Sequence, residues 1–336
     1  MELVGFKEYL QEYLQERNLD TDIIPAAINI VNEFDDFLSK SGKSVEEATY
    51  NDLHDFSAYL IDNKKNSFDN YVNLLRYGYF KKNNQLIIAA MENLDGSEVM
   101  VNFSKRLVEE FGEEVRNEIF DDIEVLPLGL HPKKKPEITK KVIERFLAKV
   151  NHEKCTAFLA NGLRDKYPQS YKSAREKFLK AKNIDEFLEI QRLDFIDTLR
   201  KNQEEDTLFF TQEINNKVLE YVKNQQGMTE AGIREGNKVI MTKIPYMTKQ
   251  YLNETDDMKK KYWYCHCPWV REALLEEDQP VDPIFCNCSA GYYKNFWEAV
   301  LDQSVKVEVV ESVLKGDSAC KFALHLPQEI VDALEK

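Results

Sequence analysis

The spacing of apolar residues changes near residue 236, and this change constrains the fold more than any other feature of the sequence. Up to about residue 224, apolar residues recur three and four positions apart, the spacing of amphipathic helices. Later, Val305, Val307 and Val309 alternate with charged residues, and Gly316-Asp317 provides a turn signal before a second alternating run. We therefore predict an α+β protein, with an all-helical N-terminal domain followed by a helix-rich α+β domain that contains a small antiparallel sheet.

Length and composition suggest where the domains begin and end. A chain of 336 residues is expected to form two or three domains. The segment from Pro127 to Pro136 contains three prolines and Gly129, which makes it the clearest linker. We expect a helical domain at 1–95, a helical connector and linker at 96–137, and an α+β ligand-binding or catalytic domain at 138–336.

Local patterns in the α+β domain give specific expectations. Residues 238–244 and 262–265 are predicted strands, and residues 269–275 a short helix. Ser289 is a suitable N-cap for the next helix, which carries aromatic residues at helical spacing. A terminal helix is expected after Pro327.

Composition and missing motifs restrict the classes of function. No run of about 18 apolar residues is present and the N-terminus lacks a signal pattern, so we expect a cytoplasmic protein without a membrane partner. The net charge of −14 would repel nucleic acid, which is therefore not an expected partner. The sequence contains no GxGxxG, phosphate-loop, HExxH or GxSxG motif, and nucleotide-dependent chemistry is not expected.

Five of the six cysteines lie between residues 265 and 320. In an extended segment, residues i and i+2 point the same way, so Cys265 with Cys267, and Cys286 with Cys288, would each present two thiolates to one side. Four converging thiolates suit tetrahedral zinc, which is the expected cofactor. Buried or reactive free thiols and a regulatory disulfide remain alternatives, whereas the familiar iron–sulfur spacings are absent.

Other residues of this domain are candidates for binding or catalysis. Glu311 has the strand parity of the inward valines, and a buried carboxylate is a candidate general acid/base or ligand contact unless a bulge turns it outward. Cys320 shares an apolar face and is either a core thiol or a ligand contact. Tyr292 and Trp297 are either ordinary core or the wall of a pocket for an aromatic ligand.

The N-terminal helices resemble the SAM-like, core-binding domain of phage integrases. The similar segments are residues 34–38 (FDDFL), 49–53 (TYNDL) and 70–80 (NYVNLLRYGYF). Residues 1–95 hold 9 Lys and Arg against 17 Asp and Glu, a net charge of −8, which is the wrong sign for a DNA clamp. Association, including a homo-oligomer, or regulation is the expected role.

The C-terminal part resembles the four-vinyl-reductase-like domain, and more closely its bacterial relatives that include 2-amino-thiazoline-4-carboxylate hydrolase. The similar segments are residues 286–298 (CNCSAGYYKNFWE), 305–312 (VKVEVVES) and 316–322 (GDSACKF), and Cys155 matches an early cysteine of these relatives. The resemblance implies an α+β fold with a small-molecule pocket. Some members are sensors whose zinc is held by cysteines and an acid. Cys320 matches their late cysteine, while Ser312 and Val309 replace another cysteine and the acid, so zinc here is expected on the two Cys-x-Cys units.

Three hypotheses follow. The first is a small-molecule-binding protein with a cysteine-lined, zinc-containing pocket. The second is a hydrolase that opens a small C–N or C–S heterocycle, in which zinc-bound water attacks or Cys286 or Cys288 is the nucleophile, and Glu311 is the general acid/base. The third is a DNA-associated regulator. Whether the protein is an enzyme stays open at this point.

Overall fold

The computed structural model describes residues 2–123, 127–166, 168–225, 227–228, 231–276 and 281–334. These residues form two compact units. Unit 1 comprises residues 2–97 together with 127–134, and unit 2 comprises 98–123 together with the described residues from 135 onward. The expected connector is therefore divided, because its helices belong to unit 2 while its proline-containing segment belongs to unit 1.

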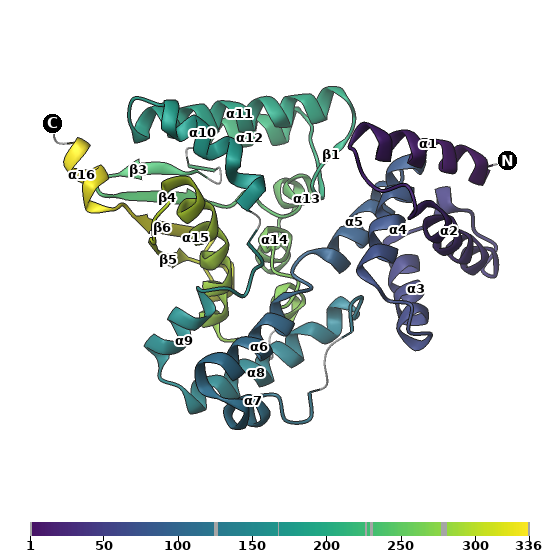
Figure 1. Cartoon of the computed structure of the whole chain (residues 1–336), viewed down its shortest axis with the longest axis horizontal. Coiled ribbons are helices and arrows are strands. Elements are labelled where there is room, and N and C mark those ends of the chain that lie inside the picture. Colours follow the sequence, from purple (N-terminus) through teal and green to yellow (C-terminus); the bar gives the residue numbers. More distant parts are fainter. Residues whose placement is uncertain are drawn as a thin grey trace. The chain divides into compact units, whose positions relative to one another are not determined.

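Unit 1 is a helical bundle (Figure 1). Its helices are α1 (Glu2–Glu16), α2 (Ile24–Ser39), α3 (Tyr50–Asp62), α4 (Phe68–Lys81) and α5 (Asn84–Leu94), with short 3-10 helices at Val45–Glu47 and Pro132–Lys134. Thr49 and Asp52 form a capping box that starts α3. The helices pack their apolar faces together to form the core, in which Phe6, Phe34 and Phe56 are fully buried.

Unit 2 combines helices with two small antiparallel sheets. Its helices are α6 (Val99–Phe111), α7 (Glu113–Ile119), α8 (Lys135–Lys149), α9 (His152–Leu159), α10 (Lys172–Lys180), α11 (Ile184–Glu204), α12 (Asn216–Asn224), α13 (Thr248–Asn253), α14 (Asp257–Tyr264), α15 (Asn287–Leu301) and α16 (Gln328–Leu334). Short 3-10 helices are η3 (Pro168–Tyr171), η4 (Arg271–Leu275), η5 (Pro283–Cys286) and η6 (Val313–Lys315). The predicted α+β class, with a helical N-terminal region, is confirmed.

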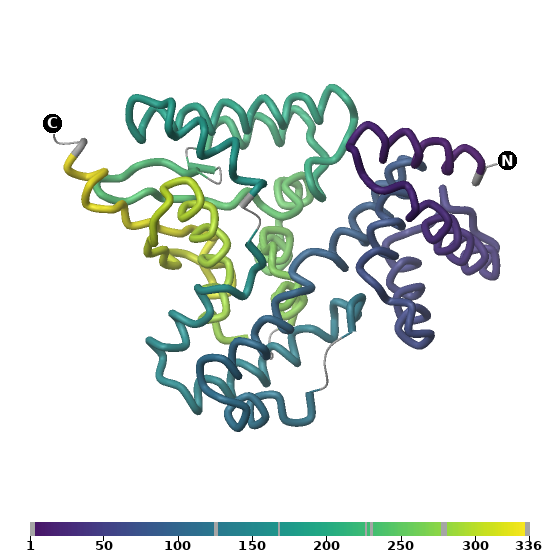
Figure 2. Tube along the Cα trace, in the orientation of Figure 1, coloured from purple at the N-terminus to yellow at the C-terminus, as the bar shows by residue number. Residues whose placement is uncertain are grey.

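The larger sheet has the strand order β3-β4-β6-β5. Its strands are β3 (Ile233–Glu235), β4 (Lys238–Thr242), β5 (Lys306–Glu311) and β6 (Lys321–His325); the smaller sheet pairs β1 (Leu208–Phe209) with β2 (Gln212–Glu213). Figure 2 shows the β3–β4 segment running beside the much later β5–β6 segment. The central pair β4–β6 is antiparallel, so two stretches about eighty residues apart in sequence are joined by their backbones.

Helix α15 packs against this sheet. Trp297 is fully buried, and its indole N–H donates a hydrogen bond to Met241 Sδ of β4 at 3.1 Å. The ring of Tyr293 lies 4.8 Å from that of Phe322 of β6. Gly291 allows the other side of α15 to approach the end of α9, since a Cβ atom there would lie 2.9 Å from the Ala160 carbonyl oxygen. These contacts fix how the N-terminal end of α15 meets the sheet.

Several local expectations are confirmed and others are wrong. The strand at 238–244, the hairpin around Gly316 and the helix after Pro327 are present. Residues 262–265 do not form a strand, because they complete α14, where an Asp256 side chain accepts a hydrogen bond from Lys259 N–H and starts the helix. Helix α15 begins at Asn287 rather than after Ser289, because η5 runs directly into it.

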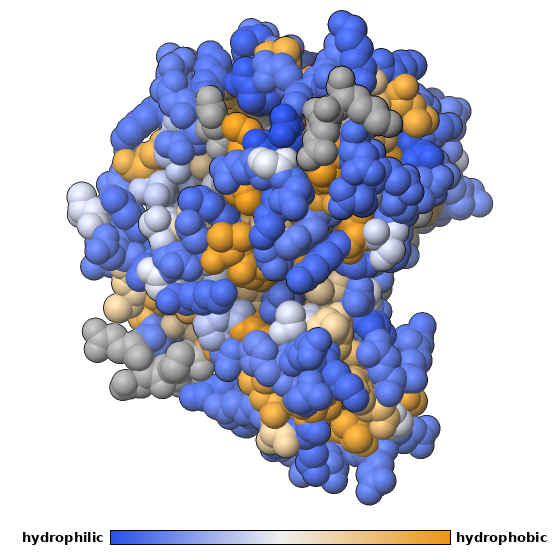
Figure 3. All heavy atoms as spheres, turned by 90° about the vertical axis from the view of Figure 1, so that its left-hand side faces the viewer, coloured by the Kyte–Doolittle hydropathy of each residue, from blue (hydrophilic) through white to orange (hydrophobic). Residues whose placement is uncertain are grey.

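None of the described helices is both long enough and apolar enough to cross a membrane. On the face shown in Figure 3, outside the grey atoms, the surface is mostly hydrophilic and hydrophobic side chains form small separate groups. This surface is in keeping with the 31% of charged residues in the sequence.

Two glycines next to β3 provide a matched test of the sheet. Both Gly232 and Gly236 have positive φ (+79° and +63°), but a Cβ at Gly232 would lie 2.4 Å from the Ile240 carbonyl oxygen, whereas nothing lies within 4 Å at Gly236. We expect Gly232→Ala to lower the free energy of unfolding by about 3 kcal/mol and Gly236→Ala by about 1 kcal/mol, because only the former adds a steric clash to backbone strain. Urea unfolding of both variants measures the difference, and equal losses would contradict the close approach.

Candidate functional site

Cys265 and Cys267 are placed by the end of α14. The Tyr264 carbonyl accepts a hydrogen bond from Tyr246 N–H at 3.2 Å, and the Cys267 carbonyl accepts one from Arg271 N–H at 3.0 Å. Cys265 caps the helix with an extended backbone (φ −72°, ψ 122°). Cys265, His266 and Cys267 all line the same cavity.

Cys286 reaches the cavity from η5, at the start of α15. Its Sγ lies 3.0 Å from Ser312 Oγ. Ser312 is buried and held on both sides: its N–H donates to Asp317 Oδ2 at 2.8 Å, and its Oγ accepts a hydrogen bond from Leu314 N–H at 3.1 Å. This arrangement ties the Cys286 sulfur to the connection between β5 and β6.

Cys320 enters the cavity immediately before β6. Its carbonyl accepts a hydrogen bond from Lys243 N–H at 3.0 Å, which extends the β4–β6 pairing by one step. Lys243 also lines the cavity, and its Nζ donates to Ser289 Oγ at 3.3 Å. Three separate stretches of chain thus bring four cysteines to a common place, and a fourth stretch brings Lys243.

The cavity itself has a volume of about 20 Å³. It is lined by Lys243, Cys265, His266, Cys267, Val270, Phe285, Cys286, Ser289, Ser312, Val313, Cys320 and Phe322. A space of this size holds one water molecule or one ion, but no organic ligand. No carboxylate occurs among these lining residues. In the described part of the chain, no three His, Cys, Asp or Glu side chains are already gathered as a metal-ligand group.

Burial keeps the thiols protonated when no metal is bound. Removal from water raises the pKa of Cys286 to about 12 and raises those of Cys265 and Cys320, because the charged thiolate is poorly solvated inside the protein. The hydrogen bond from Ser312 and the charge of Lys243 oppose this increase at Cys286. Such thiols are poor nucleophiles at neutral pH, since the thiolate is the reactive form.

His266 also lines the cavity, and its ring is held by two residues that do not line it. Its Nε2 lies 2.6 Å from the Ile244 carbonyl oxygen, and its ring packs edge-on against Tyr246 at 5.3 Å. A carbonyl can only accept, so Nε2 carries the proton of this contact and Nδ1 is the nitrogen that could coordinate a metal.

Cys288 does not join the other four. It is buried in α15 and does not line the cavity. Burial raises its pKa to about 12. The expectation that Cys286 and Cys288 point the same way is wrong because these residues enter a helix, where positions i and i+2 face apart. Cys320 occupies the place that we expected Cys288 to take.

Glu311 does not face the core. A bulge between Val309 and Glu311 shifts the register of β5, so that Glu311 lies opposite Lys321 instead of Cys320. Its carboxylate pairs with Lys321 Nζ at 2.9 Å and is 33% exposed. Glu311 is therefore not the buried carboxylate on which its expected role as a general acid/base depends.

The remaining candidate residues lie elsewhere in unit 2. Trp297 is core, as described above. Tyr292 borders an open groove of about 450 Å³ together with Tyr171 and Phe296. Cys155 is fully buried in α9, where its Sγ contacts the Val150 carbonyl at 3.3 Å, and burial raises its pKa to about 11.

Lys243 lines the cavity, although it is not among the site residues expected from the sequence. The alternation of residues along β4 could have indicated this position. Val239 and Met241 are fully buried, and Lys243 continues their alternation beyond the end of the strand. Lys243 is half-buried there, and its Nζ donates to Ser289 Oγ.

A family model described as a family of unknown function, DUF6144, matches residues 205–331. This match spans less than half of the chain and contains every residue that lines the cavity. No curated protein and no solved structure matches the chain.

The burial of the thiols gives a chemical prediction. In metal-free native protein at pH 8, Cys155, Cys265 and Cys288 should react with iodoacetamide at least about 100-fold more slowly than after unfolding, because they are buried and protonated. The native rates should rise with pH, since raised pKa values delay thiolate formation. Mass spectrometry of the alkylated peptides identifies each site, and native rates equal to unfolded rates would contradict the burial.

Proposed function

We propose that unit 2 binds one Zn²⁺ ion through Cys265, Cys267, Cys286 and Cys320. The observation that carries the proposal is the convergence of four cysteines, from three separate stretches of chain, on one ion-sized cavity. Thiolates are preferred zinc ligands, and four of them satisfy tetrahedral coordination. Binding on this account draws the sulfur atoms inward and displaces their protons.

The size of the cavity supports an ion over an organic ligand. Sites for drug-sized molecules usually measure about 300–1,000 Å³, whereas this cavity measures about 20 Å³. The wall contains Val270, Phe285, Val313 and Phe322, which would exclude water from a bound metal.

The charge balance also supports a metal–thiolate centre. Zinc with four thiolates carries two net negative charges. Among the residues that line the cavity, Lys243 carries the positively charged side chain. Its ammonium group would offset part of that charge, and the Ser312 hydroxyl would donate a hydrogen bond to the Cys286 sulfur. Such outer partners orient metal ligands and stabilise the ligated form.

Four protein ligands describe a closed, structural site. Catalytic zinc keeps one position open for water, and no carboxylate among the lining residues could serve as a general base. We therefore propose that the metal fastens the end of α14, the start of α15 and the β5–β6 connection to one another. Hydrolysis of a small heterocycle stays a prediction from the sequence, without a residue at the cavity to support it.

Small-molecule binding has a separate candidate location in the groove at Tyr292. Tyr171 and Phe296 meet edge-on there, with ring centres 5.5 Å apart, and the groove volume of about 450 Å³ suits a small aromatic molecule. On this account, the metal would stabilise α15, and the later turns of the same helix would line the groove.

The proposed zinc ligands include Cys320, whereas the sequence predicts Cys288 in its place. We expect one zinc per chain by elemental analysis of purified protein. Cys320→Ala should lower the zinc content by at least about tenfold, whereas Cys288→Ala, which removes a buried thiol outside the cavity, should retain it. Circular dichroism checks that both variants fold. Zinc lost in Cys288→Ala and kept in Cys320→Ala would contradict the proposed ligands.

Ser312 provides a finer test of the site. Ser312→Ala should weaken zinc affinity by about 10–100-fold, because Cys286 would lose the hydrogen bond to its sulfur. Competition with a chromogenic chelator measures the affinity. Ser304→Ala, which changes a serine outside the cavity, is the control. Equal affinity of Ser312→Ala and the control would remove Ser312 from the proposed site.

A further inference from the structure

Unit 1 contains a groove between α1 and α4 that is chemically unlike the thiol cavity. It has a volume of about 630 Å³, within the range of small-molecule sites. Three tyrosines, Tyr9, Tyr13 and Tyr79, supply aromatic walls, and the side chains of Val72 and Leu75 form part of its base. An aromatic ring would find both faces and edges of other rings to pack against.

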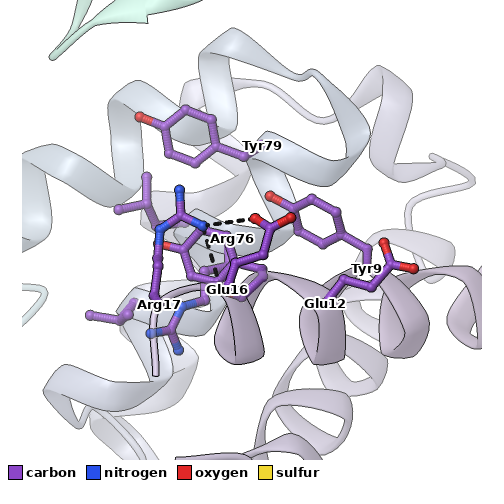
Figure 4. Close-up of a pocket in the computed structure, with 9 residues that line it drawn as sticks. Tyr9, Glu12, Glu16, Arg17, Arg76 and Tyr79 are labelled. Atoms are coloured by element: carbon purple, nitrogen blue, oxygen red, sulfur yellow. Dashed lines mark hydrogen bonds and ion pairs between the residues drawn. The ribbon is translucent and has the colours of Figure 1, made fainter. Parts of the chain in front are cut away.

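Charged groups of both signs surround these rings. The guanidinium of Arg17 lies 4.0 Å from the centre of the Tyr13 ring, and that of Arg76 lies 5.7 Å from it. Figure 4 shows Arg17 and Arg76 toward one end of the groove and Glu12 beside Tyr9 toward the other, with Glu16 between them. Glu12 and the two arginines thus lie toward opposite ends of the groove, whereas Glu16 lies beside Arg17.

The ion pair within the groove is weak. Arg17 Nη1 lies 3.6 Å from Glu16 Oε2, and the two side chains are 51% and 76% exposed. Pairs of this kind contribute little to stability, so a ligand could replace them at small cost. A guanidinium group matches a carboxylate, since it can donate two parallel hydrogen bonds to the carboxylate oxygens.

The tyrosine hydroxyls add neutral hydrogen-bonding groups. Burial raises the pKa of Tyr9, with a contribution from Tyr13, and it raises the pKa of Tyr79. Both phenols therefore keep their protons at neutral pH and can donate as well as accept.

We infer that this groove binds a zwitterionic aromatic ligand, a free aromatic α-amino acid. Its carboxylate contacts the two arginines, its ammonium group faces the glutamates, and its ring packs among the tyrosines. This assignment gives each class of lining group a partner. A ligand with only one of the two charges would contact the charged groups at one end of the groove only.

Three probes of one carbon skeleton test the assignment on the full chain. They are L-phenylalanine, 3-phenylpropionate, which lacks the ammonium group, and 2-phenylethylamine, which lacks the carboxylate. Saturation-transfer NMR titrations give their affinities. We expect L-phenylalanine to bind at least about tenfold more tightly than either analogue, because it alone satisfies both ends of the groove.

Paired variants locate the binding. Arg76→Gln and Tyr79→Ala should each weaken L-phenylalanine binding by at least about fivefold. Arg200→Gln, an arginine paired with Asp197 in unit 2, and Phe68→Ala, an exposed ring at the start of α4, should leave it unchanged. Thermal melts confirm that the variants are folded. Absence of binding by L-phenylalanine, equal binding of an analogue, or equal loss in the control variants would each overturn the inference.

Discussion

The antiparallel pairing of β4 with β6 is the contact on which the organisation of unit 2 depends. Thr242 lies opposite Lys321, and the next backbone hydrogen bond joins Lys243 to Cys320. This register puts a lysine and a cysteine at the same end of the sheet, although they are far apart in sequence. Slipping one of the two strands by one residue would turn its side chains to the opposite face, so the composition of the cavity follows from the register.

Helix α15 completes the cavity because its packing and its N-terminal end are linked. Trp297 and Tyr293 hold the helix against β4 and β6, and Gly291 lets it approach the end of α9. Its start therefore has little freedom, and Cys286 is carried to the edge of the sheet. The bond between Cys286 and Ser312 joins that helix start to the β5–β6 connection. A metal at this point would reinforce contacts that the packing already makes.

Much of the fold could be predicted from the sequence, because the periodicities of helix and strand are local properties. The alternation of valines identifies β5, and the clustering of cysteines identifies the part of unit 2 where Cys265 and Cys267 line one cavity. The assignment of Cys288 failed because the exact start of α15 depends on how η5 joins it. The assignment of Glu311 failed because a bulge is set by pairing with a distant strand.

These two failures have the same physical origin. A displacement of one or two residues in an element boundary changes which side chains share a face, and sequence patterns locate such boundaries poorly. The cavity therefore contains Cys320 where Cys288 was expected, and Lys243 where no residue was expected. Both positions follow from strand pairing across the sheet, which only the folded structure provides.

X-ray absorption at the zinc edge of the purified protein tests the central claim most directly. The account predicts a single shell of four sulfur atoms at about 2.3 Å from the metal. Protein that takes up no zinc, or zinc whose first shell consists of nitrogen and oxygen atoms at about 2.0–2.2 Å, would contradict it.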